Sequence, residues 1–191
     1  MKALEKIIGR NRSIFYEDLR QMTSTLDKIV SKSTFLVLGG AGSVGQSVSK
    51  EIIKRNPIAL HVVDINENNL VELVRDIRSS NFSFNSDFKT FPLDIGSKTY
   101  DSFFLSNGNY DYVINLSAIK HVRSEKDIYS LTRMIEVNIL NTIKTIEQSI
   151  TKGVKKYFCV STDKATNPVN LMGASKRAME LVLIDYSKDI E

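Results

Sequence analysis

The feature that most constrains the fold of this chain is a short apolar run followed by glycines at positions 39, 42 and 45. A helical pattern comes next, so the segment has the form of a strand whose C-terminal turn opens into a helix. Free backbone N–H groups and the helix dipole at such a corner attract an anion. We expect Gly39 to make the tight turn, Gly42 to admit a pyrophosphate beside Ser43 and Val44, and Gly45 to let the helix pack against the strand. The motif therefore predicts a dinucleotide site.

Apolar runs and helical patterns alternate through the rest of the chain. Continuous apolar strands separated by helices indicate an α/β, Rossmann-type fold, with a doubly wound parallel sheet and flanking helices. Pro92 indicates that the third strand is irregular or lies at an edge of the sheet. The expected strands cover residues 35–38, 59–63, 88–93, 112–116 and 156–161, and the expected helices cover residues 43–55, 67–79, 97–105, 128–151 and 171–187.

The first 33 residues precede this pattern and are expected to form an N-terminal helical extension. Apolar residues recur at helical spacing over residues 14–30, which predicts one amphipathic helix. Its apolar face is either an internal packing surface or a contact in a homo-oligomer. Residues 34–191 then form a single NAD(P)-binding domain.

Composition limits the classes of protein to which the chain can belong. It has 191 residues, 42% hydrophobic and 25% charged, which suits one globular α/β domain. The net charge of +4 comes from dispersed basic residues, so phosphate-bearing small molecules are better partners than nucleic acid. No apolar run reaches the roughly 20 residues that a membrane span needs, and we expect no signal peptide and no metal site. The single cysteine, Cys159, predicts a buried thiol in a cytoplasmic protein.

Acidic residues end the second and third strands, at the edge where this fold binds its ligands. Asp64 would accept hydrogen bonds from the adenosine ribose and repel a 2′-phosphate, so NAD is expected and NADP is the alternative; the other role for Asp64 is a helix N-cap. Asp94, followed by Ile95, would meet the adenine amino group. Ser117 and Ala118 would pass beneath the nicotinamide side, although the Ser117 hydroxyl alternatively serves only the turn.

Several segments together resemble the extended short-chain dehydrogenase/reductases. Within that superfamily, the chain is most similar to the CapD-like polysaccharide biosynthesis proteins, the UDP-N-acetylglucosamine 4,6-dehydratase group. The resemblance covers residues 34–188, and its most specific part is Ser161-Thr162-Asp163-Lys164 with the downstream Gly173-Ala174-Ser175-Lys176. The other matching segments are the glycine turn 39–45, residues 117–122, Val137-Asn138 and residues 167–172.

This resemblance implies an intramolecular redox reaction on a UDP-sugar. Hydride leaves C4 for NAD(P)⁺, water is eliminated across C5–C6, and hydride returns to C6. Asp163 matches the acid that protonates the leaving hydroxyl, and Lys164 matches the base at C5. Lys176 matches the lysine that holds the nicotinamide ribose, and Ser161, or Thr162 in its place, matches the hydroxyl that orients the C4 oxygen.

Met172 departs from the superfamily pattern. It stands one helical turn before Lys176, where the superfamily has the tyrosine that acts as the C4 base. A thioether has no titratable proton, so the C4 base is unassigned; Asp163 and a water held by Lys176 are the candidates. A branch of the resembling family also carries methionine here. The alternative is that Met172 marks a non-catalytic nucleotide-binding domain.

A basic cluster follows the fourth expected strand. Lys120, His121 and Arg123 would either receive the substrate diphosphate or form a solvated loop.

The resembling enzymes continue with a C-terminal substrate-binding region, so we expect these 191 residues to bind a dinucleotide without efficient turnover. A nucleotide-sugar epimerase or reductase, and a non-catalytic NAD(P)-binding scaffold, are the competing functions.

Overall fold

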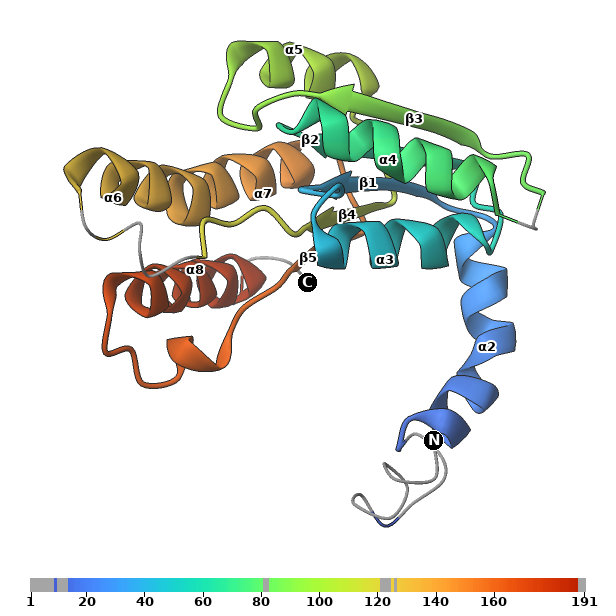
Figure 1. The fold of residues 1–191 in the computed structure, drawn as a ribbon, viewed down its shortest axis with the longest axis horizontal. Helices are drawn as coiled ribbons and strands as arrows, with labels where there is room; N and C mark the ends of the chain where they lie inside the picture. Colours follow the sequence, from blue (N-terminus) through green and yellow to red (C-terminus); the bar gives the residue numbers. More distant parts are fainter. Residues whose placement is uncertain (1–8, 10–13, 81–82, 121–124, 126, 189–191) are drawn as a thin grey trace.

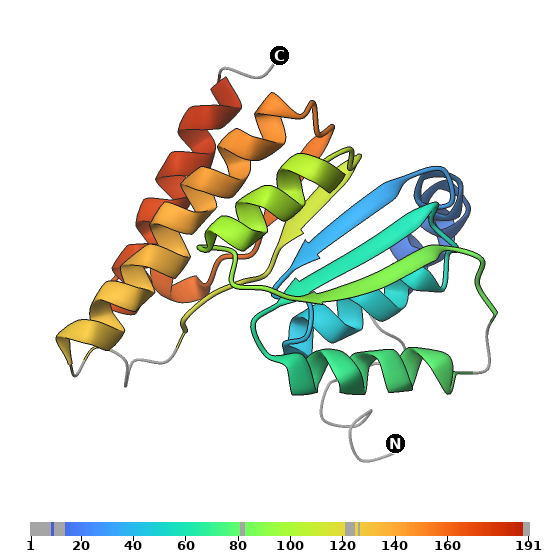
Figure 2. The same ribbon diagram turned by 90° about the horizontal axis from the view of Figure 1, so that it is seen from above.

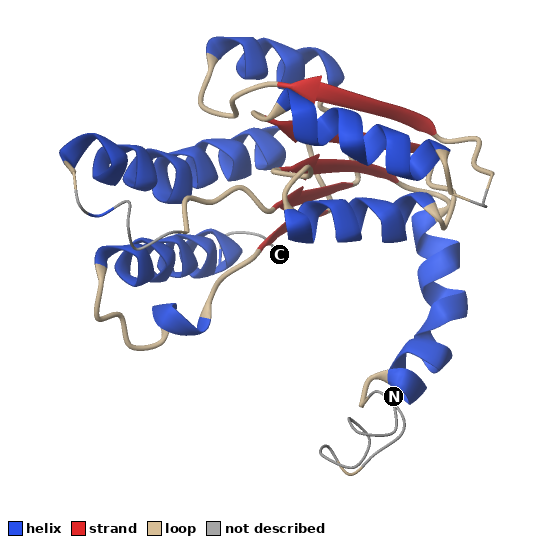
Figure 3. Ribbon diagram, viewed as in Figure 1, coloured by secondary structure: helices blue, strands red, loops and turns tan. Residues whose placement is uncertain are grey.

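A computed structural model of the chain describes residues 9, 14–80, 83–120, 125 and 127–188. Its five parallel strands form one sheet in the order β3-β2-β1-β4-β5. Figure 1 shows the sheet with its helices, and Figure 3 shows the same view coloured by secondary structure. The strands are β1 (Thr34–Leu38), β2 (Ala59–Asp64), β3 (Asp87–Pro92), β4 (Tyr112–Asn115) and β5 (Lys156–Cys159). The expected Rossmann-type α/β fold is confirmed.

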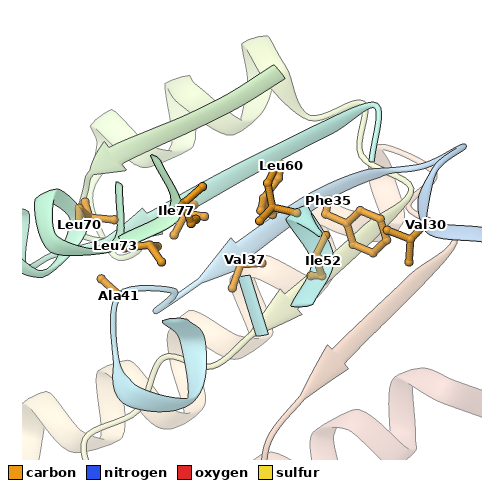
Figure 4. Packing of buried hydrophobic residues seen from close by; sticks show 11 residues of the cluster. Val30, Phe35, Val37, Ala41, Ile52, Leu60, Leu70, Leu73 and Ile77 are labelled. Carbon is orange, nitrogen blue, oxygen red and sulfur yellow. The ribbon is translucent and has the colours of Figure 1, made fainter. Parts of the chain in front are cut away.

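Helices cover both faces of this sheet. The helices α3 (Ser43–Ile53) and α4 (Glu67–Arg78) lie on one side, and α5 (Lys98–Asn107) lies on the other (Figure 2). Strand β1 is buried on both faces because its side chains alternate between two apolar clusters. Phe35 and Val37 pack with α3 and α4, as Figure 4 shows, whereas Leu36 and Leu38 pack with α5. Each fully buried aliphatic side chain of this kind contributes about 1.5–3 kcal/mol.

The connection order creates a crevice at the carboxyl ends of the strands. From β1 the chain runs to β2 and β3 on one side, and then returns to β4 and β5 on the other side. Because neighbouring connections leave in opposite directions at β1 and β4, the strand ends there are not covered by a crossover. The backbone of Gly39 hydrogen-bonds to the Val63 carbonyl, and Leu116 N–H donates to the Leu38 carbonyl, which fixes the three strand ends at one level.

The helix expected over residues 128–151 is interrupted. It consists of α6 (Ile128–Ile135), a π-helical turn η2 (Glu136–Leu140) and α7 (Asn141–Thr151). Asp127 begins it as a side-chain N-cap that accepts from the N–H groups of Tyr129 and Ser130. Single π-turns inside α-helices frequently lie at functional sites. Here the turn carries Val137, which lines a cavity, and Asn138, which hydrogen-bonds to a neighbouring loop.

The fifth strand is shorter than expected. It ends at Cys159 and not at residue 161, and a 3₁₀ turn η3 (Asp163–Ala165) follows, with Thr162 as its N-cap, before α8 (Leu171–Lys188). Phe158 is 56% exposed because β5 lies at an edge of the sheet. The other edge is β3, where Pro92 is the last residue of the strand, so the expectation drawn from this proline is confirmed.

The expected N-terminal helix is present as α2 (Tyr16–Val30) and projects away from the sheet (Figure 1). Val30 at its end joins the core, whereas Leu19 and Met22 are 56% and 50% exposed. In the described part of the chain, no helix combines the length and the apolar character that a bilayer span requires.

Candidate functional site

The glycine turn after β1 leaves no room for a side chain at Gly39 or at Gly45. Gly39 has φ +69°, and a Cβ there would lie 2.7 Å from the backbone nitrogen of Ser117. At Gly45 a Cβ would lie 2.6 Å from the Cα of Gly40, so α3 can sit on the turn only without one. Gly42 differs, because the nearest protein atom to its Cβ would be the Gly39 carbonyl oxygen at 3.6 Å. Gly42 therefore meets an open space.

Two adjoining cavities occupy the crevice at the strand ends. The β5-side cavity has about 300 Å³ and the β3-side cavity about 370 Å³. They share Gly39, Gly42, Leu116, Ala118 and Lys120, so they form one trough across the glycine turn. The β5-side cavity is completed by Ser43, Val44, Gly45, Val160, Ser161, Thr162, Lys164, Met172 and Lys176. The β3-side cavity is completed by Asp64, Ile65, Leu93, Asp94, Ile95, Ser117, Ile119, Arg133 and Val137.

Asp64 braces the glycine turn from the end of β2. Its Oδ2 accepts from the Ala41 N–H at 2.9 Å, and its Oδ1 accepts from the Asn66 N–H at 2.9 Å. The N-cap of α4 is Asn66, whose side chain accepts from Asn69, so the N-cap alternative for Asp64 is wrong. Each carboxylate oxygen keeps a second lone pair, and Asp64 lines the β3-side cavity.

Asp94 and Ile95 line the same cavity from the end of β3. The Asp94 carboxylate accepts from the Gly96 N–H at 2.8 Å and forms an ion pair with Arg133 of α6. Sequence reasoning did not identify Arg133, because it lies 39 residues beyond Asp94 and belongs to no motif.

The loop after β4 is held by side chains on two sides. Asn115 Oδ1 accepts from the Ser117 N–H at 3.0 Å, so the backbone of Ser117 belongs to the turn. Asn138 from the π-turn bonds both to the Ile119 N–H and to the Ile119 carbonyl, each at 2.9 Å. Its amide also donates to Ser175 Oγ on α8 at 3.0 Å. The signal for Asn138 was present in the Val137-Asn138 segment, but no site role was assigned to it.

Lys176 places a buried ammonium in the β5-side cavity. It is 6% exposed, and among the described residues its hydrogen-bond partner is the thioether of Met179 at 3.3 Å. Sulfur of this type is a weak acceptor. Burial lowers the pKa of the Lys176 amine, while the Cys159 thiol and Glu180 oppose that shift. A cation so poorly paired indicates a missing acceptor in the cavity. The Cys159 thiol lies beside it, and burial raises the pKa of this thiol.

Met172 sits one helical turn before Lys176 and is 4% exposed. Its sulfur-bearing side chain lines the β5-side cavity where the superfamily places a base. Its backbone N–H donates to Glu125 Oε1 at 2.8 Å, so a carboxylate caps the first turn of α8. No sequence pattern pointed to this contact.

The Ser-Thr-Asp-Lys segment is divided between the cavity and the surface. Ser161 donates to Glu180 Oε1 at 2.5 Å, and Glu180 also pairs with Arg177. Thr162 and Lys164 line the β5-side cavity, with the Lys164 side chain 52% exposed. Asp163 does not line this cavity, and its side chain is 87% exposed. The Thr162 hydroxyl and then Lys164 lower the pKa of Asp163.

The basic cluster is placed only in part. Lys120 lines both cavities at the junction of the trough. His121 and Arg123 lie outside the described residues. The expected contact of Lys120 with a substrate diphosphate stays a prediction.

The chain matches a known protein family over most of its length. Residues 35–191 match the family described as polysaccharide biosynthesis protein. The chain belongs to this family. It is a CapD-like polysaccharide biosynthesis protein, and its relatives are described as proteins of several kinds. An uncharacterized membrane protein of Methanocaldococcus jannaschii is 33% identical over 163 residues, covering 85% of this chain and 46% of that protein.

Two enzymes are similar at the same level. An inverting UDP-N-acetylglucosamine 4,6-dehydratase of Campylobacter jejuni is 34% identical over 152 residues, covering 78% of this chain and 42% of the enzyme. A UDP-glucose 4-epimerase of Rickettsia prowazekii is 31% identical over 155 residues, covering 79% of this chain and 42% of the epimerase. The chain therefore spans less than half the length of these curated relatives.

Solved structures agree on the fold. Pen from Bacillus thuringiensis superimposes with a TM-score of 0.72 at 28% identity, covering 83% of this chain and 47% of Pen. WbmF from Bordetella bronchiseptica, solved in complex with NAD⁺, gives a TM-score of 0.65 at 22% identity, covering 84% and 47%.

Proposed function

We propose that this polysaccharide biosynthesis protein carries the cofactor-binding part of an NAD-dependent UDP-sugar 4,6-dehydratase. The observation that carries the proposal is the single trough. It brings the glycine turn, the buried Lys176 ammonium and the Lys164 amine to one surface. A dinucleotide, with its pyrophosphate on the turn, would reach from Asp64 to Lys176.

The residues present fit a nicotinamide dinucleotide. Gly42 supplies no side-chain cap, so the first N–H groups of α3 are free to bind phosphate oxygens. The Asp64 lone pairs suit two ribose hydroxyls, and its charge disfavours a 2′-phosphate, which supports NAD. Lys176 lacks a strong acceptor, and the hydroxyls of the nicotinamide ribose would supply one.

The chemistry follows from the Lys164 and Lys176 amines, which line the β5-side cavity, and from the exposed Asp163 carboxylate next to Lys164 in the chain. When bound, a nicotinamide would accept hydride from C4 of the sugar and return it to C6. Lys164 would remove the C5 proton from the open side of the cavity. Asp163 would protonate the departing C6 hydroxyl. Since the pKa of Asp163 is lowered here, the bound substrate must raise it again by covering this exposed carboxyl.

The C4 hydroxyl proton has two candidate acceptors because Met172 cannot take it. Asp163 is ionised in this arrangement and is one of them. A water held by Lys176 is the other. Ser161 donates its own proton to Glu180, so in this arrangement it would act toward the sugar as an acceptor. Thr162 would serve the orienting role equally, since its hydroxyl also lines the cavity.

An epimerase is the second candidate function, because a relative with that name is 31% identical. Exchange with solvent separates the two. When a dehydratase acts in D₂O, UDP-N-acetylglucosamine loses one water and its product carries deuterium at C5. The product of a C4 epimerase shows neither change. In the natural protein that carries this chain, Lys164→Ala should abolish water loss and keep NAD⁺ affinity. Unchanged dehydration by this variant would refute the role of Lys164.

The 191 residues by themselves are proposed to bind the dinucleotide without efficient turnover. The relatives named as enzymes are more than twice as long as their matched parts, and the Lys164 side chain is 52% exposed. Incubation of the chain with NAD⁺ and UDP-N-acetylglucosamine, followed by mass spectrometry, tests this. Rapid loss of water would contradict the proposal.

A further inference from the structure

An ion pair closes the β3-side cavity at the end remote from Lys176. Arg133 of α6 places its Nη2 2.5 Å from Asp94 Oδ2, and both side chains line the cavity. Their side chains are 37% and 32% exposed, so the pair is only partly buried. Asp94 comes from the end of β3, which makes the pair a bridge between the sheet and α6.

Both members of this pair are held by a second partner. Arg133 Nη1 lies 3.2 Å from Glu136 Oε2, and Glu136 begins the π-turn. Asp94 Oδ1 accepts from the Gly96 N–H at 2.8 Å. Two residues after Glu136, Asn138 bonds to Ile119 in the loop at the opposite wall. The guanidinium therefore cannot swing away without breaking contacts that also shape the cavity.

This arrangement fixes what the Asp94 carboxylate can do toward a ligand. Each oxygen already accepts one proton from the protein, and each keeps a second lone pair. A carboxylate is an acceptor without a proton to donate, and the ion pair with the Arg133 guanidinium fixes the orientation of this one. A purine with an exocyclic amino group at C6 would satisfy this acceptor. A purine with a keto oxygen at C6 would place one acceptor against another.

We propose that Arg133 is a positioning residue for base selection. By holding the Asp94 carboxylate in one orientation, it makes this end of the cavity selective for adenine over hypoxanthine. The proposal rests on the proposed function, in that the ligand is a nicotinamide dinucleotide with its base near β3.

Calorimetric titration of the chain with NAD⁺ and with its hypoxanthine analogue, deamino-NAD⁺, tests the proposal. The wild type should prefer NAD⁺ by about tenfold or more, as expected for one charge-assisted hydrogen bond. Arg133→Gln should weaken NAD⁺ binding by about tenfold and bring the preference close to one. Arg133→Lys should restore part of the preference. Arg75→Gln is the matched control, because Arg75 also pairs with a glutamate three residues away but lies exposed on α4.

The outcomes are distinct. If Arg133→Gln keeps the preference, or weakens both dinucleotides equally, Arg133 is only structural and the proposal is overturned. If the wild type binds both dinucleotides equally well, base selection is refuted while the proposed function stands. If the wild type binds neither, the proposed function fails with it. Urea unfolding of each variant shows whether it is folded, and Asp94→Asn should reproduce the lost preference in a folded chain.

Discussion

Replacing Gly39 by alanine tests how tightly the glycine turn is packed against the loop after β4. Gly39 has φ +69°, a conformation that costs an alanine about 1–2 kcal/mol. The added Cβ would also lie 2.7 Å from Ser117 N, 2.8 Å from Ser117 Cα and 2.9 Å from the Leu116 carbonyl carbon. All three are backbone atoms, so the overlap is relieved only by moving strand ends, at a cost of about 1–3 kcal/mol.

The chain contains a control for the first of these terms. Gly153 also has φ +69°, but nothing lies within 4 Å of the Cβ position there. Gly153→Ala should therefore lower the free energy of unfolding by about 1–2 kcal/mol, and Gly39→Ala by about 2–5 kcal/mol. Urea denaturation followed by circular dichroism measures both values.

The difference in free energy of unfolding between the two variants measures the cost of the close approach between residue 39 and the loop after β4. An equal loss in both would show that backbone conformation alone accounts for Gly39, and the packing argument would be wrong. A loss at Gly39 that exceeds the loss at Gly153 by at least about 1 kcal/mol supports it.

Three further predictions concern charged groups. Lys176→Met should raise the free energy of unfolding by about 1–3 kcal/mol, because it removes a buried ammonium paired with a thioether, and should weaken NAD⁺ binding by about tenfold to a hundredfold; a variant that is less stable and binds equally well would contradict both claims. Asp64→Asn keeps an acceptor for the Ala41 N–H but removes the charge, so the affinity ratio of NAD⁺ to NADP⁺ should fall by about tenfold or more in parallel titrations; tighter binding of NADP⁺ by the wild type would refute the reading of Asp64. Burial lowers the pKa of His61, whose ring bonds to the Tyr110 hydroxyl at 2.7 Å. The unfolded chain thus binds this proton more readily, and the stability that neutral His61 contributes, present above about pH 6.5, is lost as the pH falls toward its folded pKa. His61→Gln should flatten this part of the pH dependence measured by urea unfolding; an identical slope in both proteins would rule His61 out as its source.

The regular elements were predictable because each depends on local pattern. Strand β1 and helix α3 follow from an apolar run and three glycines, and α4 follows from its apolar face. The errors occur where tertiary contacts override the pattern. The helix over residues 128–151 reads as continuous, because a π-turn has no signature in apolar spacing. Strand β5 ends early because Thr162 caps the 3₁₀ turn after it.

The candidate site divides in the same way. Gly39 and Asp64 were placed by their spacing and Lys176 by the family resemblance, and all three line one trough. Arg133 could not be placed, because its partner Asp94 lies 39 residues away and no local sequence pattern links the two residues. The bond between Ser161 and Glu180 joins the segment after β5 to the third turn of α8, which only the packed fold reveals.

The central claim is that this chain holds a nicotinamide dinucleotide against the glycine turn, and Gly42→Val tests it most directly. Gly42 has φ −68° and ψ 168°, an extended conformation that valine adopts readily, and its Cβ would meet only one protein atom within 4 Å, at 3.6 Å. The side chain would instead occupy the space over the first turn of α3. We predict that the wild type binds one equivalent of NAD⁺ by calorimetric titration and that Gly42→Val, with an unchanged urea midpoint, binds none. Equal binding by the two proteins would contradict the account.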